Sequence, residues 1–318
     1  MKHQSAAVAT AGAKGARMGT TRNTITTVTT AIVLVASAWL GGCGGGGGSS
    51  ATEAPPVVVT PPPTPPVVVA PPSNAPAGYS LVWADEFDID GLPNASRWDY
   101  DTDRNPFGWY NNERQYYARE RLENARVTNG KLVITARKES LSSQPDWGGQ
   151  AYSSARLITR GKAAWTYGFI EVRAKLPCGV GTWPAIWMLG TGGRWPDDGE
   201  IDIMEQVGSN PTRVFGTLHT ATRGGPVKSG ATTVSNPCTA FHDYQLTWTA
   251  DEIVIGVDNK PYFRAPRIAG GYAAWPFDAP QYLLLNIAIG GDLGGAVDDT
   301  IFPVTLEVEH VRVYQRQP

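Results

Sequence analysis

The stretch Gly199-Glu200-Ile201-Asp202-Ile203-Met204-Glu205 places three carboxylates within six residues and interleaves them with isoleucines. In a β-strand, successive side chains point to opposite faces of the sheet. A strand that buries Ile201 and Ile203 therefore aligns Glu200 and Asp202 on the opposite face. The pattern predicts a half-buried strand with an acidic outer face rather than a polar loop.

The last carboxylate of this stretch, Glu205, is out of phase with the other two by one residue. A single β-bulge near Ile203 and Met204 returns it to the acidic face, and bulges are common beside active sites. With that bulge, the carboxyl groups of Glu200 and Glu205 are expected about 5–6 Å apart, near the roughly 5–5.5 Å that a retaining glycosidase needs. Asp202 between them would push their pKa values apart, so that one is ionised and one protonated near neutral pH.

Two other interpretations of the acidic stretch remain open. The first is a surface strand with acidic decoration, although like charges on one face repel each other and the nearby Trp183, Trp187 and Trp195 are typical of a binding cleft. The second is a calcium site. Carboxylates on a regular strand, without a glycine-bearing loop between them, do not converge on one ion as those of an EF-hand loop do. A catalytic role is therefore favoured.

Residues 181–189 (GTWPAIWML) and the acidic stretch that follows them resemble glycoside hydrolase family 16, most closely its bacterial endo-β-1,3-glucanases, the laminarinases. The Glu-x-Asp-x-x-Glu spacing matches the bulged form of the family signature. The resemblance extends over residues 79–315, and residues 108–113 (GWYNNE) and 154–157 (SARL) are further matching stretches.

From the resemblance we expect Glu200 to be the nucleophile, Glu205 the general acid/base, and Asp202 the residue that orients Glu200 and modulates the charge of the pair. The order of the two glutamates comes from the family match, because their spacing alone is symmetric. Asn112 and Arg156 lie in family-like stretches, and the resemblance suggests that both contact sugar near the catalytic centre.

Aromatic side chains in a sugar-binding cleft stack on the apolar faces of the rings. Trp183 and Trp187 share parity on one strand and are expected to face the cleft, while Trp195, in the loop before the acidic strand, is a candidate for its rim. His219 either points into the cleft or is a structural histidine. The histidines show no metal-ligand spacing, so no cofactor is expected to be required for catalysis.

The rest of the domain predicts an all-β fold. No segment sustains the helical period of about 3.6 residues over three turns. Asn129-Gly130 is a strong two-residue hairpin signal and Asp258-Asn259 a weaker one. The resemblance sharpens the class to a concanavalin A-like β-jelly-roll sandwich of two antiparallel sheets with a concave substrate cleft. Strand-like stretches recur at residues 80–83, 131–137, 151–159, 168–176, 200–205, 214–220, 243–249, 252–257, 281–289 and 306–314.

The N-terminal quarter predicts a targeting segment and a linker. Residues 1–43 carry positive charge, no acidic residue and a short apolar run, and they end in LGGC, which resembles a bacterial lipobox. That resemblance implies cleavage before Cys43 and lipidation of its thiol; an ordinary secretion signal is the alternative. Residues 44–78, first Gly/Ser-rich and then Pro/Val-rich, favour an extended spacer. Residues 79–318 form one catalytic domain, of a length normal for a β-sandwich.

We therefore expect an exported protein, either lipid-anchored to the bacterial cell envelope or secreted, that meets a membrane only through its N-terminal lipid. The chain has 27 basic and 29 acidic side chains, and no basic patch stands out in its mature part, which argues against a nucleic-acid partner. The expected partner is a β-1,3-glucan polysaccharide or oligosaccharide, bound by a monomer.

Two further sites are expected in the mature domain. Cys178 and Cys238 form either a disulfide, as in many exported proteins, or two buried free thiols. Several laminarinase-like proteins carry a structural calcium ion on the convex face, and the resemblance places Glu86, the Gly130 carbonyl and Glu309 at similar positions here.

The sequence thus predicts a retaining endo-β-1,3-glucanase that hydrolyses internal bonds of laminarin-type glucans by a double displacement on two glutamates. A hydrolase of the same fold that acts on mixed-linkage glucan, agarose or carrageenan is one alternative. Mixed-linkage specialists usually have the unbulged Glu-x-Asp-x-Glu form, so the extra Met204 argues against them. A non-catalytic β-glucan-binding protein is the other alternative, because a fold does not fix a function.

Overall fold

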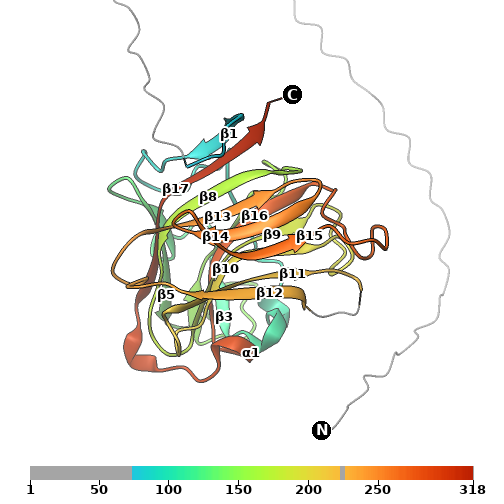
Figure 1. Cartoon of the computed structure of the whole chain (residues 1–318). Coiled ribbons are helices and arrows are strands. Elements are labelled where there is room, and N and C mark those ends of the chain that lie inside the picture. The colour runs from blue at the N-terminus through green and yellow to red at the C-terminus, as the bar shows by residue number, and fades with distance from the viewer. Residues whose placement is uncertain (1–73, 223–225, 318) are drawn as a thin grey trace, which may run out of the picture. The chain divides into compact units, whose positions relative to one another are not determined.

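The computed structural model describes residues 74–222 and 226–317. The predicted targeting segment, the lipidation site Cys43 and the linker up to residue 73 lie outside the described residues. Within the part of the chain that the structure describes, no helix is long and apolar enough to cross a membrane. The described residues form two β-sheets that share one hydrophobic core (Figure 1).

The larger sheet has ten strands among the described residues, in the order β15-β14-β13-β8-β17-β5-β6-β3, with β1 paired to β17 and β4 paired to β5. Its strands are β1 (Tyr79–Asp85), β3 (Gln115–Tyr117), β4 (Ala125–Val127), β5 (Leu132–Lys138), β6 (Tyr152–Ser154), β8 (Gly168–Lys175), β13 (His242–Trp248), β14 (Glu252–Val257), β15 (Lys260–Pro266) and β17 (Val304–Arg316).

The smaller sheet has seven strands among the described residues, in the order β12-β11-β10-β9-β16-β7-β2. Its strands are β2 (Asp99–Tyr100), β7 (Arg156–Ile158), β9 (Thr182–Gly190), β10 (Glu200–Gln206), β11 (Arg213–His219), β12 (Pro226–Thr233) and β16 (Gln281–Ile289). The helical elements are short: η1 (Asn105–Phe107), η2 (Tyr110–Asn112), α1 (Gly291–Gly294) and η3 (Asp299–Ile301). The predicted all-β sandwich of two sheets is confirmed, and the acidic stretch is its strand β10.

Most predicted strands coincide with observed ones, but the prediction of a single strand over residues 151–159 is wrong. The strand is interrupted at Ala155, and β6 joins the larger sheet while β7 joins the smaller one. The predicted stretches also lacked β2, β3, β4, β9, β12 and β15. Of these, β12 and β15 are edge strands at the ends of their sheets. Pro261 and Pro266 lie within β15, where an edge tolerates them because no further strand needs their N–H groups.

Both predicted hairpin turns, at Asn129-Gly130 and Asp258-Asn259, are present and have positive φ angles at their two central residues. Asn129 and Gly130 have φ angles of 52° and 69° between β4 and β5, and Asp258 and Asn259 have φ angles of 51° and 60° between β14 and β15. A two-residue turn with positive φ at both positions matches the twist of the strands that it joins. These turns set the register of two hairpins in the larger sheet.

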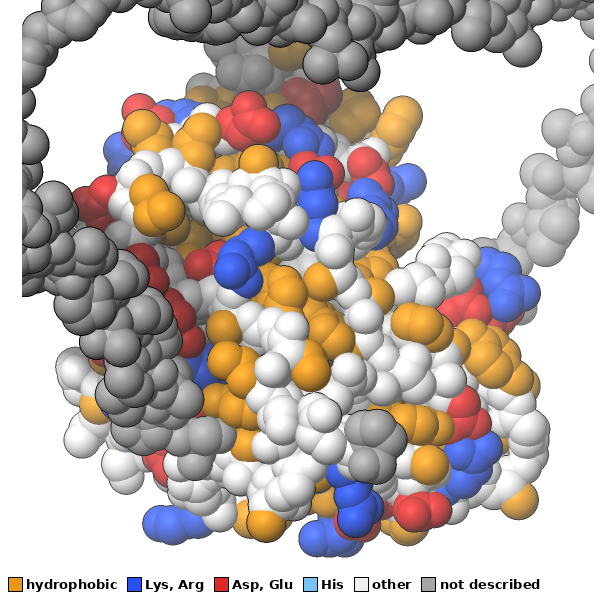
Figure 2. Space-filling model, turned by 90° about the horizontal axis from the view of Figure 1, so that it is seen from above, with side chains coloured by type: hydrophobic (Ala, Val, Ile, Leu, Met, Phe, Trp, Pro, Cys, Tyr) orange, Lys and Arg blue, Asp and Glu red, His pale blue; other side chains and the backbone are white. Residues whose placement is uncertain are grey.

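The core lies between the sheets and follows the predicted alternation. Ile170, Val172 and Ala174 of β8 have no exposed surface, and neither do Ile186 and Met188 of β9. On the molecular face drawn in Figure 2, acidic and basic side chains lie interspersed over the surface, in keeping with the balanced composition.

Cys178 and Cys238 form a disulfide with Cα atoms 5.7 Å apart, which closes a loop across a sequence separation of 60 residues. Of the two alternatives for these cysteines, the structure has the disulfide. Such a link stabilises a fold mainly by restricting the unfolded chain.

Replacing both cysteines by serine should lower the free energy of unfolding by about 2–4 kcal/mol, because the unfolded chain regains the freedom of a long loop. Urea unfolding of the oxidised wild type and of the double variant measures the difference. An unchanged midpoint would show that the disulfide contributes nothing to stability.

Candidate active site

Strand β10 contains the predicted bulge. On the β9 side, the register holds through Asp202 and shifts before Met204, so that Ile203 is the extra residue. Ile201, Ile203 and Met204 all have no exposed surface. The bulge therefore keeps these three apolar side chains in the core while it changes the phase of the strand.

The bulge returns Glu205 to the face of Glu200 and Asp202, where the three carboxyl groups interact electrostatically. On the β11 side, Asp202 pairs with Thr217 and Glu205 pairs with Phe215, so the bulge lies opposite Gly216. A Cβ atom at Gly216 would lie only 2.9 Å from the Asp202 carbonyl oxygen, so this position requires glycine. The sequence predicted the bulge but not its glycine partner.

All three carboxyl groups have raised pKa values, above all because they are buried, which disfavours the charged form. Burial and the charge of Asp202 raise the pKa of Glu200 to about 8. Burial raises the pKa of Glu205 to about 7, with the charges of Glu200 and Glu113 acting in the same direction. Burial and the charge of Glu205 raise the pKa of Asp202 well above its ordinary value.

In the free cleft, Glu200 thus has a higher pKa than Glu205, the reverse of the order that a nucleophile and an acid require. The hydrogen bond between Glu200 and Asp202 raises the pKa of Glu200 and lowers that of Asp202. The charge of Glu205 in turn raises the pKa of Asp202, and Glu205 keeps its own proton below a pH of about 7. The protonation of each carboxyl group therefore depends on the other two.

Trp183 and Trp195 donate indole hydrogen bonds to the two glutamates of the cluster. Trp183 donates from Nε1 to Oε1 of Glu205 over 2.9 Å, and Trp195 donates from Nε1 to Oε2 of Glu200. Trp195 is 60 % exposed, as expected of a rim residue, whereas Trp183 is only 8 % exposed. Trp183 thus lies on the cleft side of β9, where its indole supports Glu205, and its contact with sugar stays a prediction.

His219 belongs to the cleft rather than to the core. Its Nε2 lies 3.1 Å from Oδ2 of Asp202, and its ring lies 6.1 Å from that of Trp195. Trp187 is half-buried on β9 and donates from Nε1 to Oδ1 of Asn286 over 2.7 Å. The carboxyl cluster is thus surrounded by aromatic and imidazole groups from β9, β11 and the loop before β10.

Arg156 lies in the same face of the smaller sheet, on β7, but it is buried. Its Nε lies 3.1 Å from Oδ2 of Asp101. Its guanidinium carbon lies 5.1 Å from the ring centre of Trp109 and 4.6 Å from that of Trp187. The structure therefore places Arg156 as a charged link between two tryptophans, close to the cleft.

The segment around η2 contributes one residue that the sequence analysis did not single out. Burial raises the pKa of Glu113 and the charge of Arg156 lowers it, with burial the stronger effect. The charge of Glu113 in turn raises the pKa of Glu205. The one feature of the sequence that could have identified Glu113 is its position at the end of the GWYNNE stretch, residues 108–113. Asn112, the preceding residue, donates from Nδ2 to Oδ1 of Asp292 over 2.7 Å.

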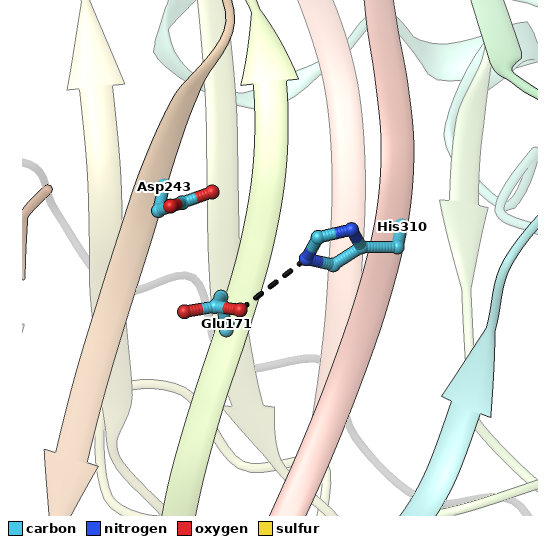
Figure 3. Close-up of side chains that lie close together, drawn as sticks. All are labelled: Glu171, Asp243 and His310. Carbon is cyan, nitrogen blue, oxygen red and sulfur yellow. Dashed lines mark hydrogen bonds and ion pairs between the residues drawn. The ribbon is translucent and has the colours of Figure 1, made fainter. Parts of the chain in front are cut away.

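A second group of ligand-type side chains lies on the larger sheet (Figure 3). Glu171, Asp243 and His310 each offer one atom within 4.8 Å of the others. Burial raises the pKa of Glu171, but hydrogen bonds from His310, Gln245 and Asn74 outweigh burial and hold this pKa below its ordinary value. Asn74 also donates to Asp243. The group is a satisfied polar network that links β8, β13 and β17.

The residues proposed for calcium have other partners in this structure. Glu86 accepts hydrogen bonds of 2.7 and 2.8 Å from Arg312, and Glu309 accepts one of 2.7 Å from Arg173. Carboxylate oxygens that are paired with arginine are not available as calcium ligands. This arrangement of Glu86 and Glu309 therefore does not fit the ion, and calcium binding at Glu86, Gly130 and Glu309 stays a prediction.

The Trp183→Phe variant keeps an aromatic ring but loses the indole hydrogen bond that lowers the pKa of Glu205. Without that bond Glu205 should keep its proton to a higher pH. We expect the alkaline limb of the kcat/KM profile, which reports the acid in the free enzyme, to move upward from a pH of about 7. pH–rate profiles on a soluble β-glucan measure this shift.

Trp187→Phe is the matched control, because its indole donates to Asn286 and not to a carboxyl group of β10. Its alkaline limb should stay in place. Equal limbs in wild type and Trp183→Phe, or equal shifts in both variants, would contradict the assigned role of the Trp183 indole.

Comparisons with known proteins agree with this geometry. Residues 112–300 match the family model described as glycosyl hydrolases family 16. A β-glucanase of Rhodothermus marinus is 49 % identical over 252 residues, which cover 74 % of this chain and 85 % of that protein. The structure of a variant of SCLam, described as a non-specific endo-β-1,3(4)-glucanase, is similar with a TM-score of 0.74 at 53 % identity, covering 77 % of this chain and 98 % of that one. The laminarinase of Rhodothermus marinus has a TM-score of 0.70 at 48 % identity, covering 76 % and 98 %. The chain therefore belongs to family 16 of the glycosyl hydrolases and is a glycosidase.

Proposed function

We propose that this protein is a retaining endo-β-1,3-glucanase that cuts internal bonds of laminarin-type glucans. The observation that carries the proposal is the bulged strand β10, which gathers Glu200, Asp202 and Glu205 on one face with raised pKa values. Paired carboxyl groups, one ionised and one protonated, are the chemistry that retaining glycoside hydrolysis needs.

In the proposed mechanism, Glu200 attacks the anomeric carbon and forms a glycosyl-enzyme intermediate. Glu205 protonates the departing glycosidic oxygen, then takes a proton from the water that hydrolyses the intermediate. Asp202, hydrogen-bonded to Glu200, orients this nucleophile and modulates the charge of the two glutamates. Trp195 and Trp183 orient the two glutamates through their indole N–H groups.

The substrate class is supported by the relatives. Laminarinase is the printed name of the Rhodothermus marinus structure, and the SCLam variant is described with a 1,3-β-D-cellobiosyl-glucose at its active site. The description of SCLam as a non-specific endo-β-1,3(4)-glucanase also favours a second activity on mixed-linkage glucan. We rank that activity second, because the bulged signature with Met204 is unlike that of mixed-linkage specialists.

Glu200→Gln and Glu205→Gln should each lower kcat on laminarin by about 10²–10⁴-fold or more, because each removes one of the two reacting carboxyl groups. Reducing-sugar release from laminarin, lichenan, agarose and κ-carrageenan measures both activity and substrate. Glu123→Gln, on a side chain that is 57 % exposed, is the matched control and should keep wild-type rates.

Wild-type turnover in either active-site variant would remove its glutamate from the mechanism. Preferential attack on agarose or carrageenan would keep the mechanism but replace the substrate. Binding of laminarin with no release of sugar from any polysaccharide would make the protein a glucan-binding module.

The roles of the two glutamates separate with azide and an activated aryl glucoside. Azide attacks the glycosyl-enzyme of Glu205→Ala and yields a product of retained configuration, whereas it attacks the substrate directly in Glu200→Ala and inverts the anomeric centre. The opposite pattern would exchange the two roles. NMR of the glycosyl azide identifies the anomer.

We further propose export and anchoring through a lipid on Cys43, supported by the LGGC sequence at residues 40–43. In a bacterial host, Cys43→Ser should abolish incorporation of labelled palmitate and move the activity from the membrane fraction to a soluble one. Labelling that persists in this variant would contradict the anchor.

A further inference from the structure

The bulge in β10 sets the position of Glu205, so the groups that hold the bulge act on the reaction, an argument that rests on the proposed function. The extra residue of the bulge is Ile203, which has no exposed surface. Such a residue lies outside the regular hydrogen-bond ladder of the sheet. A buried carbonyl group without a partner is unfavourable, so the carbonyl of Ile203 needs a donor from elsewhere.

Tyr262 of β15 supplies that donor. Its hydroxyl group donates to the carbonyl oxygen of Ile203 over 3.4 Å, although the two residues lie 59 positions apart in the chain and on different sheets. Burial, followed by the charges of Glu205 and Asp202, raises the pKa of Tyr262. The hydroxyl therefore keeps its proton at neutral pH, remains a donor, and interacts electrostatically with the carboxyl groups of the cleft.

A second bulge, in β15, directs Tyr262 toward the core. Ile255 of β14 pairs with Phe263, and the next residue, Gly256, pairs with Pro261, so that Tyr262 is the extra residue between these pairs. A bulge changes the direction of a side chain. As a result Tyr262 and Phe263 both pack against the core, although consecutive side chains of a regular strand point to opposite faces.

Gly216 of β11 leaves the space that the hydroxyl group occupies. This glycine lies opposite the bulge of β10. A Cβ atom at this position would lie 3.1 Å from the hydroxyl oxygen of Tyr262 and 2.8 Å from Cδ1 of Ile255. The absence of a side chain therefore lets a group from the larger sheet reach the bulge of the smaller sheet.

We infer that Tyr262 is a positioning residue of the reaction: by holding the carbonyl of Ile203 it places Glu205 for proton transfer. Glu200 and Asp202 precede the bulge, and Glu205 follows Ile203 by two residues. Loss of the hydroxyl group therefore affects the acid/base and spares the nucleophile. Proton transfer needs its two partners within hydrogen-bond reach, so a small displacement of Glu205 is sufficient to slow it.

The test compares Tyr262→Phe with wild type on laminarin and on an aryl β-laminaribioside with a dinitrophenyl leaving group. Laminarin needs a proton from Glu205 when its bond breaks, whereas dinitrophenolate departs without one. The kcat/KM value, which covers only the steps up to that cleavage, should fall by about 10- to 100-fold on laminarin. On the aryl substrate it should stay at the wild-type value.

Tyr244→Phe is the matched control. Tyr244 belongs to the same core, and its buried hydroxyl has no hydrogen-bond partner among the described residues. This variant should keep wild-type kcat/KM on both substrates. Gly216→Ala, which crowds the hydroxyl of Tyr262 from the other side, should show the same preferential loss on laminarin as Tyr262→Phe. Urea unfolding midpoints establish that each variant is folded.

Equal losses of Tyr262→Phe on the two substrates would overturn the positioning role, because they would indicate a general structural effect. Wild-type kcat/KM on laminarin in this variant would overturn it as well. Either result, obtained beside an active wild type, leaves the proposed function intact. Wild-type protein that releases sugar from neither substrate would instead overturn the proposed function, and the role of Tyr262 with it.

Discussion

The burial of three carboxyl groups on one strand is the constraint on which the rest of the site depends. The same β10 residues that face away from the cleft, Ile201, Ile203 and Met204, are fully buried in the core. The strand therefore cannot rotate or slip without exposing them. The carboxyl groups are held together by the packing on the opposite face, and they respond by binding protons rather than by moving apart.

The pKa of a buried carboxyl group is shifted down on the larger sheet and up on the smaller sheet. On the larger sheet, Glu171 is buried among enough donors to hold its pKa below the ordinary value. On the smaller sheet, Glu205 has one indole donor and three acidic neighbours, Glu200, Asp202 and Glu113, and its pKa rises to about 7. The number of hydrogen-bond donors and the charge of the neighbouring groups both contribute to the difference. Structural carboxylates are stabilised as ions, whereas those of the cleft are kept able to exchange a proton.

Much of this organisation could be predicted from local patterns. Period-two alternation identified β8 and β10, and turn chemistry identified the hairpins at Asn129-Gly130 and Asp258-Asn259. The break at Ala155 could not be predicted, because residues 153–158 are buried throughout and carry no local signal of where one sheet ends and the other begins. Edge strand β15 could not be predicted either, because its two prolines lower its β-strand propensity. In the structure, pairing with the single neighbouring strand β14 is sufficient for it to form.

The sequence by itself determined the chemistry of the protein: which residue types alternate on β10, where the bulge must lie, and which turns join the hairpins, because these depend on neighbours along the chain. Only the tertiary structure decided how the groups act on one another. It buried Trp183 against Glu205, brought His219 to Asp202, and set Glu113 close enough to raise the pKa of Glu205. These relations join residues far apart in the chain, and the strength of each depends on distance and burial, which exist only once the sheets have packed.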